Sequence, residues 1–368
     1  MKNILVIGAG KIGAVVADLL GNAQAAGGGA YRVTLADRSA ELLAAVAAES
    51  GRSKRVSTLE LDVTDAAALR AALEGRFAVL SAAPYHLTVA IAQAARDAGV
   101  HYLDLTEDVA STRRIREIAA GASTAFVPQC GLAPGFISIV AADLARRFDS
   151  LDSVRLRVGA LPAYPSNALN YNLTWSTDGV INEYCEPCEA IVDGRLREVP
   201  ALEEREEFSL DGVLYEAFNT SGGLGTLCET LAGRVRTLNY RTIRYPGHAA
   251  IMKALLNDLR LRDRRDLLKT ILENVLPSTL QDVVIVFVTV SGLRAGKLVQ
   301  ETYASKIYSR EIGGVMRSAI QITTAAGITG VLDLLATGRI REHGFVRQEE
   351  IALPLFLANR FGRLYAAD

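Results

Sequence analysis

The chain has 368 residues, of which 50% are hydrophobic and 22% are charged, and its formal net charge is -1 at pH 7. This length accommodates two domains with substantial cores, and the near-zero charge argues against nucleic acid or an anionic membrane as a partner. The longest apolar run, residues 283–288, is too short to span a bilayer. The apolar N-terminus lacks a signal-peptide cleavage pattern, so we expect a cytoplasmic protein with no membrane partner.

The N-terminal segment carries a dinucleotide-binding pattern. Apolar residues 4–7 run directly into Gly-Ala-Gly-Lys-Ile-Gly at residues 8–13, and an apolar helical pattern follows. Strand, tight turn and helix in this order place backbone N–H groups and the positive end of a helix dipole where a pyrophosphate can bind. Gly8 permits the turn, Gly10 leaves room for the phosphates, and Gly13 allows the helix to pack closely on the strand.

A second predicted strand, residues 31–36, ends in the acid Asp37. This acid comes a few residues later than usual because a glycine-rich loop at 21–29 lengthens the connection. A carboxylate at this position accepts hydrogen bonds from ribose hydroxyls and repels a 2′-phosphate. Asp37 therefore favours NAD as the cofactor, while the adjacent Arg38 keeps NADP as the alternative.

Up to about residue 128, short β-rich runs alternate with helical ones, which predicts a doubly wound parallel sheet. Thr64 is expected to cap a helix that begins near residue 65, and Gly99 to end a helix at 87–98. Ligands of such sheets lie across the carboxyl ends of the strands. The predicted cofactor-binding residues are Gly8, Gly10, Lys11, Ile12, Gly13, Asp37, Arg38, Asp62, Val63, Ser81, Ala82, Ala83 and Pro84.

Beyond about residue 150 the pattern becomes that of an antiparallel sheet. Residues 154–158 alternate apolar and charged side chains, which predicts a strand with one solvent-exposed face. Residues 282–290 and 298–308 predict a hairpin around a turn at 291–296, and residues 249–275 predict one long helical stretch.

An apolar helix at 318–335 is expected to return to the nucleotide domain, because a terminal element needs an existing core to bury its apolar side. The predicted fold class is α/β, with a doubly wound (Rossmann) parallel sheet and a second α+β domain that contains a largely antiparallel sheet. The predicted domains are a dinucleotide-binding domain at 1–134, a substrate-binding and oligomerisation domain at 135–317, and C-terminal helices at 318–368.

The four cysteines are too few for a disulfide framework in a chain of this length. Cys185 and Cys188 have the spacing of a metal or redox motif, but no second cysteine pair or nearby histidine completes a zinc site. We therefore expect reduced thiols and no metal site.

Several segments resemble the saccharopine dehydrogenase family. Residues 129–135 are similar to its link out of the nucleotide domain, residues 159–162 with 167–176 to its substrate-domain signature, and residues 242–248 to its other hallmark. The resemblance implies a nicotinamide cofactor and a reaction that oxidises or forms a C–N bond in an amino acid or polyamine. Ala133 stands where saccharopine and carboxynorspermidine dehydrogenases often carry an acid, so the chain looks more like the lysine 6-dehydrogenases.

This chemistry suggests roles for particular residues. Hydride leaves a carbon bonded to nitrogen only when the nitrogen is neutral, whereas a lysine ε-amine has a pKa near ~10.4. The cation of Arg244 would lower this pKa, and His248, or alternatively His86, would act as the base. The planar guanidinium of Arg244 also suits a substrate carboxylate. His248 and Arg244 are thus the predicted catalytic residues.

The predicted substrate pocket has aromatic walls: Tyr171 and Trp175 would enclose the apolar stem of the substrate. Glu107 is expected to contact either a substrate amine or the cofactor ribose. The predicted substrate-binding residues are Tyr85, Glu107, Leu161, Pro162, Tyr171, Trp175, Arg244 and Tyr245.

The predicted function is an NAD-dependent dehydrogenase that converts the ε-amine of L-lysine to the 6-semialdehyde and ammonia. A secondary amine such as saccharopine or carboxynorspermidine is the alternative substrate. A non-catalytic NAD(P)-binding sensor is the alternative from another class, because Rossmann domains also serve in that way. The apolar hairpin at 282–308 could offer a sheet edge, so a homodimer is expected.

Overall fold

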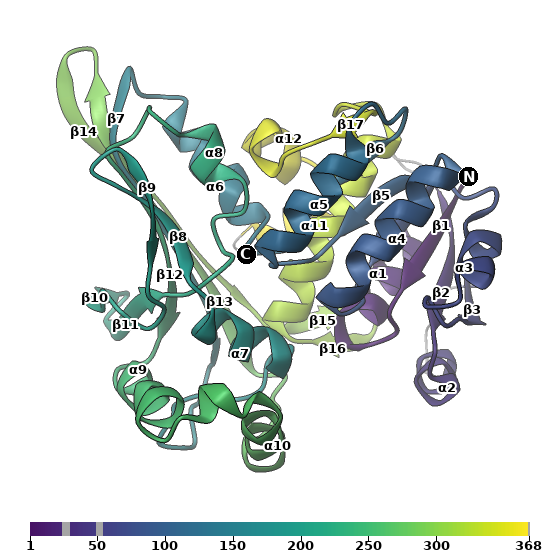
Figure 1. Ribbon diagram of the computed structural model, residues 1–368, viewed down its shortest axis with the longest axis horizontal. Coiled ribbons are helices and arrows are strands. Elements are labelled where there is room, and N and C mark those ends of the chain that lie inside the picture. Colours follow the sequence, from purple (N-terminus) through teal and green to yellow (C-terminus); the bar gives the residue numbers. More distant parts are fainter. Residues whose placement is uncertain (24–29, 49–53, 367–368) are drawn as a thin grey trace. The chain divides into compact units, whose positions relative to one another are not determined.

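The computed structural model describes residues 1–23, 30–48 and 54–366. The chain divides into two compact units, each with its own β-sheet (Figure 1). The first unit comprises Met1–Phe136, Gly313–Val315 and Gln321–Ala366, and the second comprises Ile137–Ile312 and Met316–Ile320. The predicted glycine-rich loop at 21–29 lies largely outside the described residues.

The first unit is built on a parallel sheet. In the described part of the chain, seven strands pair in the order β17-β6-β5-β4-β1-β2-β3, and each neighbouring pair is parallel. The predicted doubly wound parallel sheet is therefore confirmed. The strands are β1 (Lys2–Ile7), β2 (Tyr31–Asp37), β3 (Val56–Glu60), β4 (Ala78–Ser81), β5 (His101–Asp104), β6 (Ala125–Val127) and β17 (Gly344–Phe345).

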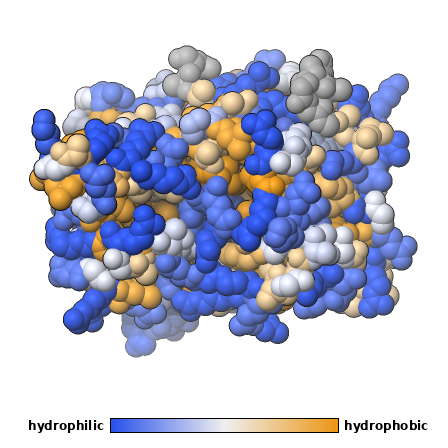
Figure 2. Space-filling view, turned by 90° about the horizontal axis from the view of Figure 1, so that it is seen from above, coloured by the Kyte–Doolittle hydropathy of each residue, from blue (hydrophilic) through white to orange (hydrophobic). Residues whose placement is uncertain are grey.

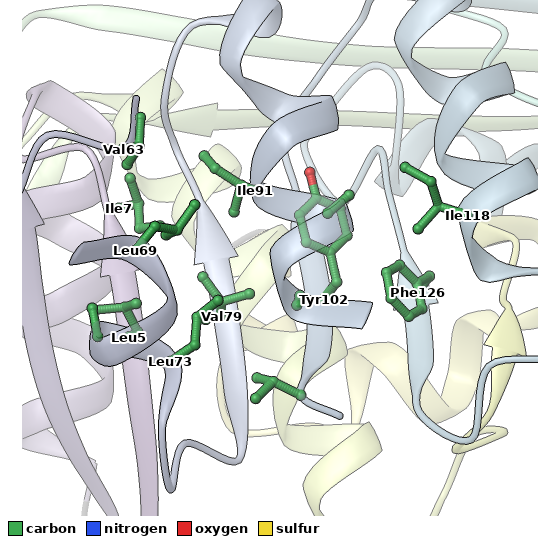
Figure 3. Close-up of a cluster of buried hydrophobic side chains, with 14 of the residues drawn as sticks. Leu5, Ile7, Val63, Leu69, Leu73, Val79, Ile91, Tyr102, Ile118 and Phe126 are labelled. Atoms are coloured by element: carbon green, nitrogen blue, oxygen red, sulfur yellow. The ribbon is translucent and has the colours of Figure 1, made fainter. Parts of the chain in front are cut away.

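Helices cover both faces of this sheet. On one face, α3 (Ala66–Leu73), α4 (Tyr85–Ala98) and α5 (Val109–Ala119) pack against the strands through a buried apolar cluster (Figure 3). The opposite face carries α1 (Lys11–Asn22) and α11 (Ala319–Ala336). Residues 4–7 are apolar without alternation because a strand buried on both sides needs apolar side chains in both directions. The cluster in Figure 3 includes Leu5, Ile7, Val63, Leu69, Leu73, Val79, Ile91, Tyr102, Ile118 and Phe126.

The ends of two helices test the predicted caps. The prediction that Thr64 caps α3 was wrong: the Asp65 carboxylate accepts the backbone N–H groups of Ala67 and Ala68, and the Thr64 hydroxyl donates to Asp62 instead. A carboxylate is a strong N-cap because it also interacts favourably with the helix dipole. The predicted stop of α4 at Gly99 is confirmed, since Gly99 is left-handed with a φ of 64°.

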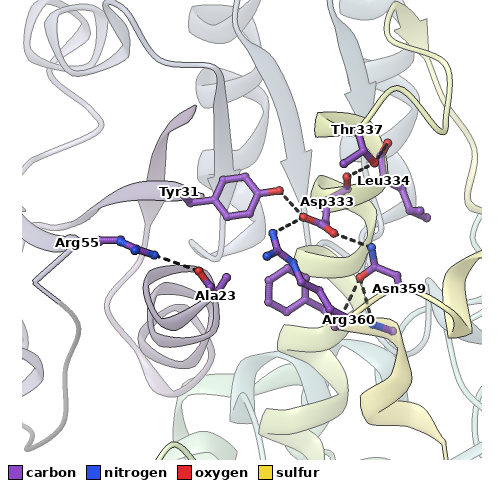
Figure 4. A network of polar contacts seen from close by, with 10 residues as sticks. Ala23, Tyr31, Arg55, Asp333, Leu334, Thr337, Asn359 and Arg360 are labelled. Carbon is purple, nitrogen blue, oxygen red and sulfur yellow. Dashed lines mark hydrogen bonds and ion pairs between the residues drawn. The ribbon is translucent and has the colours of Figure 1, made fainter. Parts of the chain in front are cut away.

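A buried polar network ties α11 to the sheet and to the C-terminal segment (Figure 4). The Asp333 carboxylate accepts hydrogen bonds from the Tyr31 hydroxyl at 2.6 Å, from Asn359 at 2.8 Å and from Arg360 at 2.6 Å. Burial raises the pKa of Tyr31, and its hydrogen bond to Asp333 raises it further. Helix α11 is thus fastened to β2 by a charge-assisted network.

Among the residues that the structure describes, one helix, α11, is long and apolar enough to cross a membrane by length and composition, and most of it is buried inside the protein. Such a helix is equally typical of a protein core. In the face shown in Figure 2, most residues are hydrophilic and apolar residues form separate patches.

The second unit contains a mostly antiparallel sheet. Among the described residues, its main path is β10-β11-β12-β7-β13-β14, and the hairpin β8–β9 joins it at β12. Only the β7–β12 pair is parallel within this part of the chain. The predicted α+β domain is confirmed. Its strands are β7 (Ser150–Pro162), β8 (Cys188–Val192), β9 (Arg195–Val199), β10 (Glu206–Leu210), β11 (Val213–Asn219), β12 (Thr237–Arg244), β13 (Asp282–Arg294) and β14 (Lys297–Tyr308).

The hairpin β13–β14 is longer and tighter than predicted. Its strands continue through the expected six-residue turn and meet at Ala295 and Gly296, which have φ angles of 50° and 74°. A two-residue turn with both φ angles positive matches the twist of the strands. The remaining short strands, β15 (Arg310–Ile312) and β16 (Val315–Arg317), pair with each other.

The predicted long helix at 249–275 was wrong. The segment forms α9 (His248–Lys253), a short π-helix at Ala254–Asp258, a 3-10 helix at Leu261–Asp263 and α10 (Arg265–Val275). The break falls at Arg260, whose φ of 57° is incompatible with a continuing helix. The other helices are α2 (Ala40–Ala48), α6 (Phe136–Ala145), α7 (Thr177–Cys185), α8 (Leu227–Thr230) and α12 (Leu353–Leu357).

The predicted solvent-exposed face of the strand at 154–158 was also wrong in part. Arg155 is exposed, but Arg157 is buried and pairs with Glu206 at 2.6 Å. Its guanidinium lies over the rings of Phe208 and Phe287. Arg157 can be buried because its charge has both a carboxylate and aromatic faces as partners.

Candidate functional site

The glycine turn of the first unit has the geometry that a dinucleotide requires. Gly8 has a φ of +102°, and a Cβ there would lie 2.7 Å from the carbonyl oxygen of Ala82. A Cβ on Gly13 would lie 1.7 Å from the carbonyl oxygen of Gly8, so only glycine lets α1 approach the turn. A Cβ on Gly10 would meet nothing within 4 Å, which leaves open space where the phosphates are expected. The residues of the turn therefore fit the predicted cofactor.

Asp37 stands at the carboxyl end of β2, beside this turn. One carboxylate oxygen accepts the Ala9 N–H at 2.8 Å, and the other accepts the Ser39 N–H at 2.9 Å. The two bonds hold the carboxylate in one orientation, next to the turn. This is the position from which an acid contacts the adenosine ribose of a dinucleotide.

Arg38 and Asp62 lie close enough to interact. Hydrogen bonds from the backbone and hydroxyl of Thr64 hold the pKa of Asp62 below its usual value, and the charge of Arg38 lowers it further. Arg38 and Asp62 are both exposed, so they can meet a ligand from solution. Val63 points instead into the apolar cluster.

The segment after β4 supplies the remaining predicted cofactor residues. Ser81 is buried at the strand end, and its hydroxyl has no hydrogen-bond partner among the residues that the structure describes. Buried hydroxyls are normally paired, so Ser81 has a free hydrogen-bonding group at the carboxyl edge of the sheet. Ala82 donates its N–H to Ile7, and the chain then turns into α4. The other predicted residues in these two segments are Lys11, Ile12, Ala83, Pro84 and Tyr85.

Glu107 lies in an acidic group that follows β5. Burial raises its pKa to about 7, and the nearby charges of Asp108 and Asp104 oppose its ionisation as well. The sequence did not single out Asp104, whose carboxylate accepts the Tyr102 hydroxyl at 2.8 Å and the N–H of Gln129 at 2.8 Å. Burial raises the pKa of Asp104 to about 6. Its position as the last residue of a predicted strand was the available signal.

The raised pKa of Glu107 leads to a pH-dependent stability. Its pKa is about 7 in the folded protein and near 4.5 otherwise, so the native state binds the proton more tightly and loses stability as pH rises between these values. Glu107→Gln is expected to raise the free energy of unfolding at pH 8 by about 1–3 kcal/mol, and by less at pH 5. Urea denaturation at both pH values measures this.

The exposed Glu117 offers a matched control, since its side chain pairs with Arg114 on the surface of α5. Glu117→Gln should change the free energy of unfolding by about a few tenths of a kcal/mol at either pH. An equal effect of Glu107→Gln at pH 5 and pH 8 would contradict a raised pKa for Glu107.

Arg244, the last residue of β12, is the centre of a buried cluster in the second unit. Its side chain donates from Nε to the Tyr184 hydroxyl at 3.0 Å and from Nη1 to the carbonyl of Ile243 at 2.9 Å. Its guanidinium carbon lies 5.0 Å from the ring centroid of Tyr171. Across the described ranges, no carboxylate lies within ion-pair distance of Arg244, although it is only 3% exposed. Glu183 is close enough to raise its pKa electrostatically.

His248 has partners on both ring nitrogens. Nδ1 lies 2.9 Å from the carbonyl oxygen of Leu169, and Nε2 lies 3.0 Å from the Tyr184 hydroxyl. A carbonyl only accepts, so Nδ1 carries the proton; Nε2 then accepts from Tyr184, whose oxygen accepts from Arg244. Burial and the charge of Arg244 lower the pKa of His248 to about 3. His248 is therefore neutral, and its Nε2 lone pair accepts the hydrogen bond of the Tyr184 hydroxyl.

Tyr184 is the functional candidate that the sequence did not reveal. It lies on α7 and joins Arg244 to His248, and burial raises its pKa although Arg244 opposes this. An aromatic residue on a helix is usually core, so no local signal marked it. The alternative base, His86, is exposed on α4 in the first unit.

The structure brings some of the predicted substrate residues together and separates others. Tyr171 contacts Arg244, and Trp175 packs against the same core cluster. Tyr245 does not join them: its ring stacks on Tyr215 and its hydroxyl donates to Pro162. Neighbouring residues of a strand point to opposite faces, which separates Tyr245 from Arg244. Leu161 also packs in the Tyr215 cluster, while Tyr85 and Glu107 belong to the first unit.

A parallel sheet with a fitted glycine turn, joined in sequence to a mostly antiparallel unit with a buried arginine cluster, defines a two-unit dinucleotide-binding protein. The chain belongs to the saccharopine dehydrogenase family. The sequence model of the saccharopine dehydrogenase NADP binding domain matches residues 4–127, and that of the saccharopine dehydrogenase C-terminal domain matches residues 131–364.

Two comparisons, both with saccharopine dehydrogenase from Saccharomyces cerevisiae, illustrate the similarity. Saccharopine dehydrogenase (NADP+, L-glutamate-forming) is 26% identical over 274 residues, which cover 71% of this chain and 59% of the relative. The chain thus matches less than two thirds of the length of that curated relative. The apo structure of histidine-tagged saccharopine dehydrogenase (L-Glu forming) is 18% identical, with a TM-score of 0.77 over 97% of this chain and 95% of the other. The second comparison shows a shared fold.

Proposed function

We propose that this protein is a nicotinamide-dependent dehydrogenase that oxidises a C–N bond of an amino acid. The observation that carries the proposal is the buried Arg244, which lacks a carboxylate partner among the described residues in a chain of the saccharopine dehydrogenase family. A buried cation of this kind is suited to bind the carboxylate of a substrate. The yeast relatives bear the name of an enzyme of this class.

Unpaired hydroxyls beside Arg244 support a carboxylate site. The hydroxyls of Tyr171 and Thr174 are buried and have no hydrogen-bond partner within the described part of the chain. Thr174 lies near the Tyr171 hydroxyl. Buried hydroxyls without partners cost free energy, and the oxygens of a bound carboxylate would satisfy them. Trp175, which follows directly, would contact the apolar stem of the substrate.

The chain's own residues then have defined tasks in the reaction. Arg244 binds and orients the substrate carboxylate through its planar guanidinium. The neutral His248 accepts a hydrogen bond from the Tyr184 hydroxyl, and Leu169 holds its ring in one tautomer. The aromatic rings around Arg244 exclude water. A nicotinamide cofactor, when bound, supplies the hydride acceptor.

For the substrate we propose L-lysine, oxidised at its ε-carbon to the 6-semialdehyde with release of ammonia. Ala133, in place of the acid frequent in saccharopine and carboxynorspermidine dehydrogenases, supports this choice. The names of the yeast relatives support saccharopine as the second candidate. A panel of amines assayed by the absorbance of the reduced cofactor separates them. Turnover of saccharopine without lysine would favour the second candidate, and nucleotide binding without any turnover would favour a sensor.

We also propose NAD as the cofactor, because the fixed Asp37 carboxylate would repel a 2′-phosphate. Two observations point toward NADP: the matched family domain is named for NADP, and so is the yeast relative. The exposed Arg38 could accept a 2′-phosphate. Comparing the KM values for the two nucleotides decides between them.

A homodimer is a further part of the proposal. Strand β14 is an edge of the second sheet along all 12 of its residues. A long sheet edge offers unpaired backbone groups to a second copy. One chain has a mass of 39.4 kDa, and sedimentation at working concentration should give twice this mass. A monomer at that concentration would contradict this expectation.

A further inference from the structure

Glu216 is a fully buried carboxylate that stands beside Arg244 without pairing with it. In the register of β11 and β12, Glu216 lies directly opposite Arg244, and its side chain is 0% exposed. Its carboxylate accepts the N–H of Ala249 at 2.7 Å, the N–H of Gly247 at 3.2 Å and a hydrogen bond from Arg205 at 3.2 Å. The acid opposite Arg244 in the sheet register is thus committed to a backbone turn and to Arg205.

That turn determines where His248 lies. Gly247 has a φ of 98°, and it joins the end of β12 to α9, which begins at His248. The two N–H groups bound by Glu216 flank His248 on either side. A charged carboxylate forms stronger hydrogen bonds with N–H groups than a neutral acceptor does, so Glu216 fixes the backbone that carries the imidazole.

The imidazole in turn orients Arg244. His248 donates from Nδ1 to Leu169 and accepts from Tyr184 at Nε2, and Tyr184 accepts from Nε of Arg244. Arginine only donates hydrogen bonds and a carbonyl only accepts them, so the two ends of this series fix the direction of every hydrogen bond between them. A displacement of the turn would therefore reach the guanidinium through two hydrogen bonds.

We propose that Glu216 is a positioning residue for Arg244: it holds the Gly247–Ala249 turn, and through His248 and Tyr184 it sets the orientation of the guanidinium. Because Glu216 binds the turn instead of Arg244, the guanidinium stays available for a substrate carboxylate. The inference rests on the proposed function for this last step. The arrangement of His248 and Tyr184 does not depend on it.

Trp175, the only tryptophan of the chain, permits a binding test that needs no turnover. In Glu216→Gln, the affinity for L-lysine and for L-saccharopine, measured by Trp175 fluorescence, is expected to fall about tenfold or more. KM should rise by a similar factor while kcat changes little, since an orienting role acts on binding. The affinity for the nucleotide should stay the same. If Glu216→Gln fails to fold, Glu216→Asp is measured instead, because it keeps the charge but is too short to hold both N–H groups.

Glu207→Gln is the matched control. Glu207 pairs with the same arginine, Arg205, at 2.6 Å, but it is exposed and does not contact the turn. This variant should bind both amines as the unaltered protein does. In a double variant, Glu216→Gln with Arg244→Gln should bind no more weakly than Arg244→Gln alone, because the first acts through the second. Additive losses, or unchanged binding in Glu216→Gln, would overturn the inference.

A second readout separates the inference from the proposed function. The ring nitrogens of His248, one of four histidines in the chain, can be followed by NMR without any ligand. We expect their chemical shifts to move in Glu216→Gln and to stay unchanged in Glu207→Gln. Unchanged shifts in Glu216→Gln would overturn the inference. If neither amine binds to the unaltered protein, the proposed function is overturned. The NMR chemical shifts of the His248 ring nitrogens then test the positioning role of Glu216 by themselves.

Discussion

Replacing Arg244 with glutamine is expected to lower kcat/KM for the amino-acid substrate by about 100-fold or more. Loss of a buried charged partner of a carboxylate costs about 2–5 kcal/mol, and about 1.4 kcal/mol corresponds to a factor of ten. Arg244 is 3% exposed, and within the described residues it hydrogen-bonds only to Tyr184 and Ile243. Its guanidinium is therefore free of a carboxylate partner and available for the substrate. Steady-state kinetics at saturating nucleotide measure the effect.

Arg241 is a suitable control for this substitution. It lies three residues earlier on β12, and it forms ion pairs with Glu204 and Glu206. Arg241→Gln should leave kcat/KM within about threefold, because its ion pairs with Glu204 and Glu206 do not involve Arg244. A second control uses 1,5-diaminopentane, which is lysine without its carboxylate. The Arg244→Gln variant should have the same kcat/KM for this diamine as the unaltered protein. Equal losses for lysine and the diamine would show that Arg244 does not bind the carboxylate.

Replacing Asp37 with asparagine is expected to shift the nucleotide preference toward NADP by about 100-fold. The amide is nearly the same size and can still accept the N–H of Ala9, so the turn should stay intact. The variant loses charge-assisted hydrogen bonds to the ribose, each worth about 1.5–3 kcal/mol, and it no longer repels a 2′-phosphate. The ratio of kcat/KM for NADP to that for NAD measures the shift.

Asp62 serves as the comparison, since it is also an acid at the carboxyl end of a strand but contacts Thr64 and Arg38. Asp62→Asn should change the ratio by less than about threefold. An unaltered protein that already prefers NADP would contradict the proposal for NAD. In that case Arg38 is the residue to replace next.

The dinucleotide site was largely predictable because its requirements are local. A strand, a turn with glycines at fixed spacings and an acid after the next strand each depend on a few consecutive residues. The structure places Gly8, Gly10, Gly13 and Asp37 in the expected positions, although Asp65, and not Thr64, caps α3. Sequence patterns of this kind describe backbone conformation, which neighbouring residues largely determine.

The cluster around Arg244 was predictable only in part. Arg244, His248 and Tyr171 were selected, but Tyr184 and Glu216 were not, and Tyr245, predicted to bind the substrate with Arg244, stacks on Tyr215 instead. The strand at Thr237–Arg244 was not predicted at all, so the opposite directions of Arg244 and Tyr245 could not be deduced. The pairing of β11 with β12 is also what brings Glu216 beside Arg244.

By itself, the amino-acid sequence determined the class of fold, the order of most elements, the nucleotide-binding turn and the resemblance to one family. Only the tertiary structure decided which polar groups meet around Arg244 and which of them are already paired. The reason is physical: the periodicity of a helix or strand indicates which side chains share a face, but cross-strand register and helix packing determine which residues, far apart in the chain, come into contact.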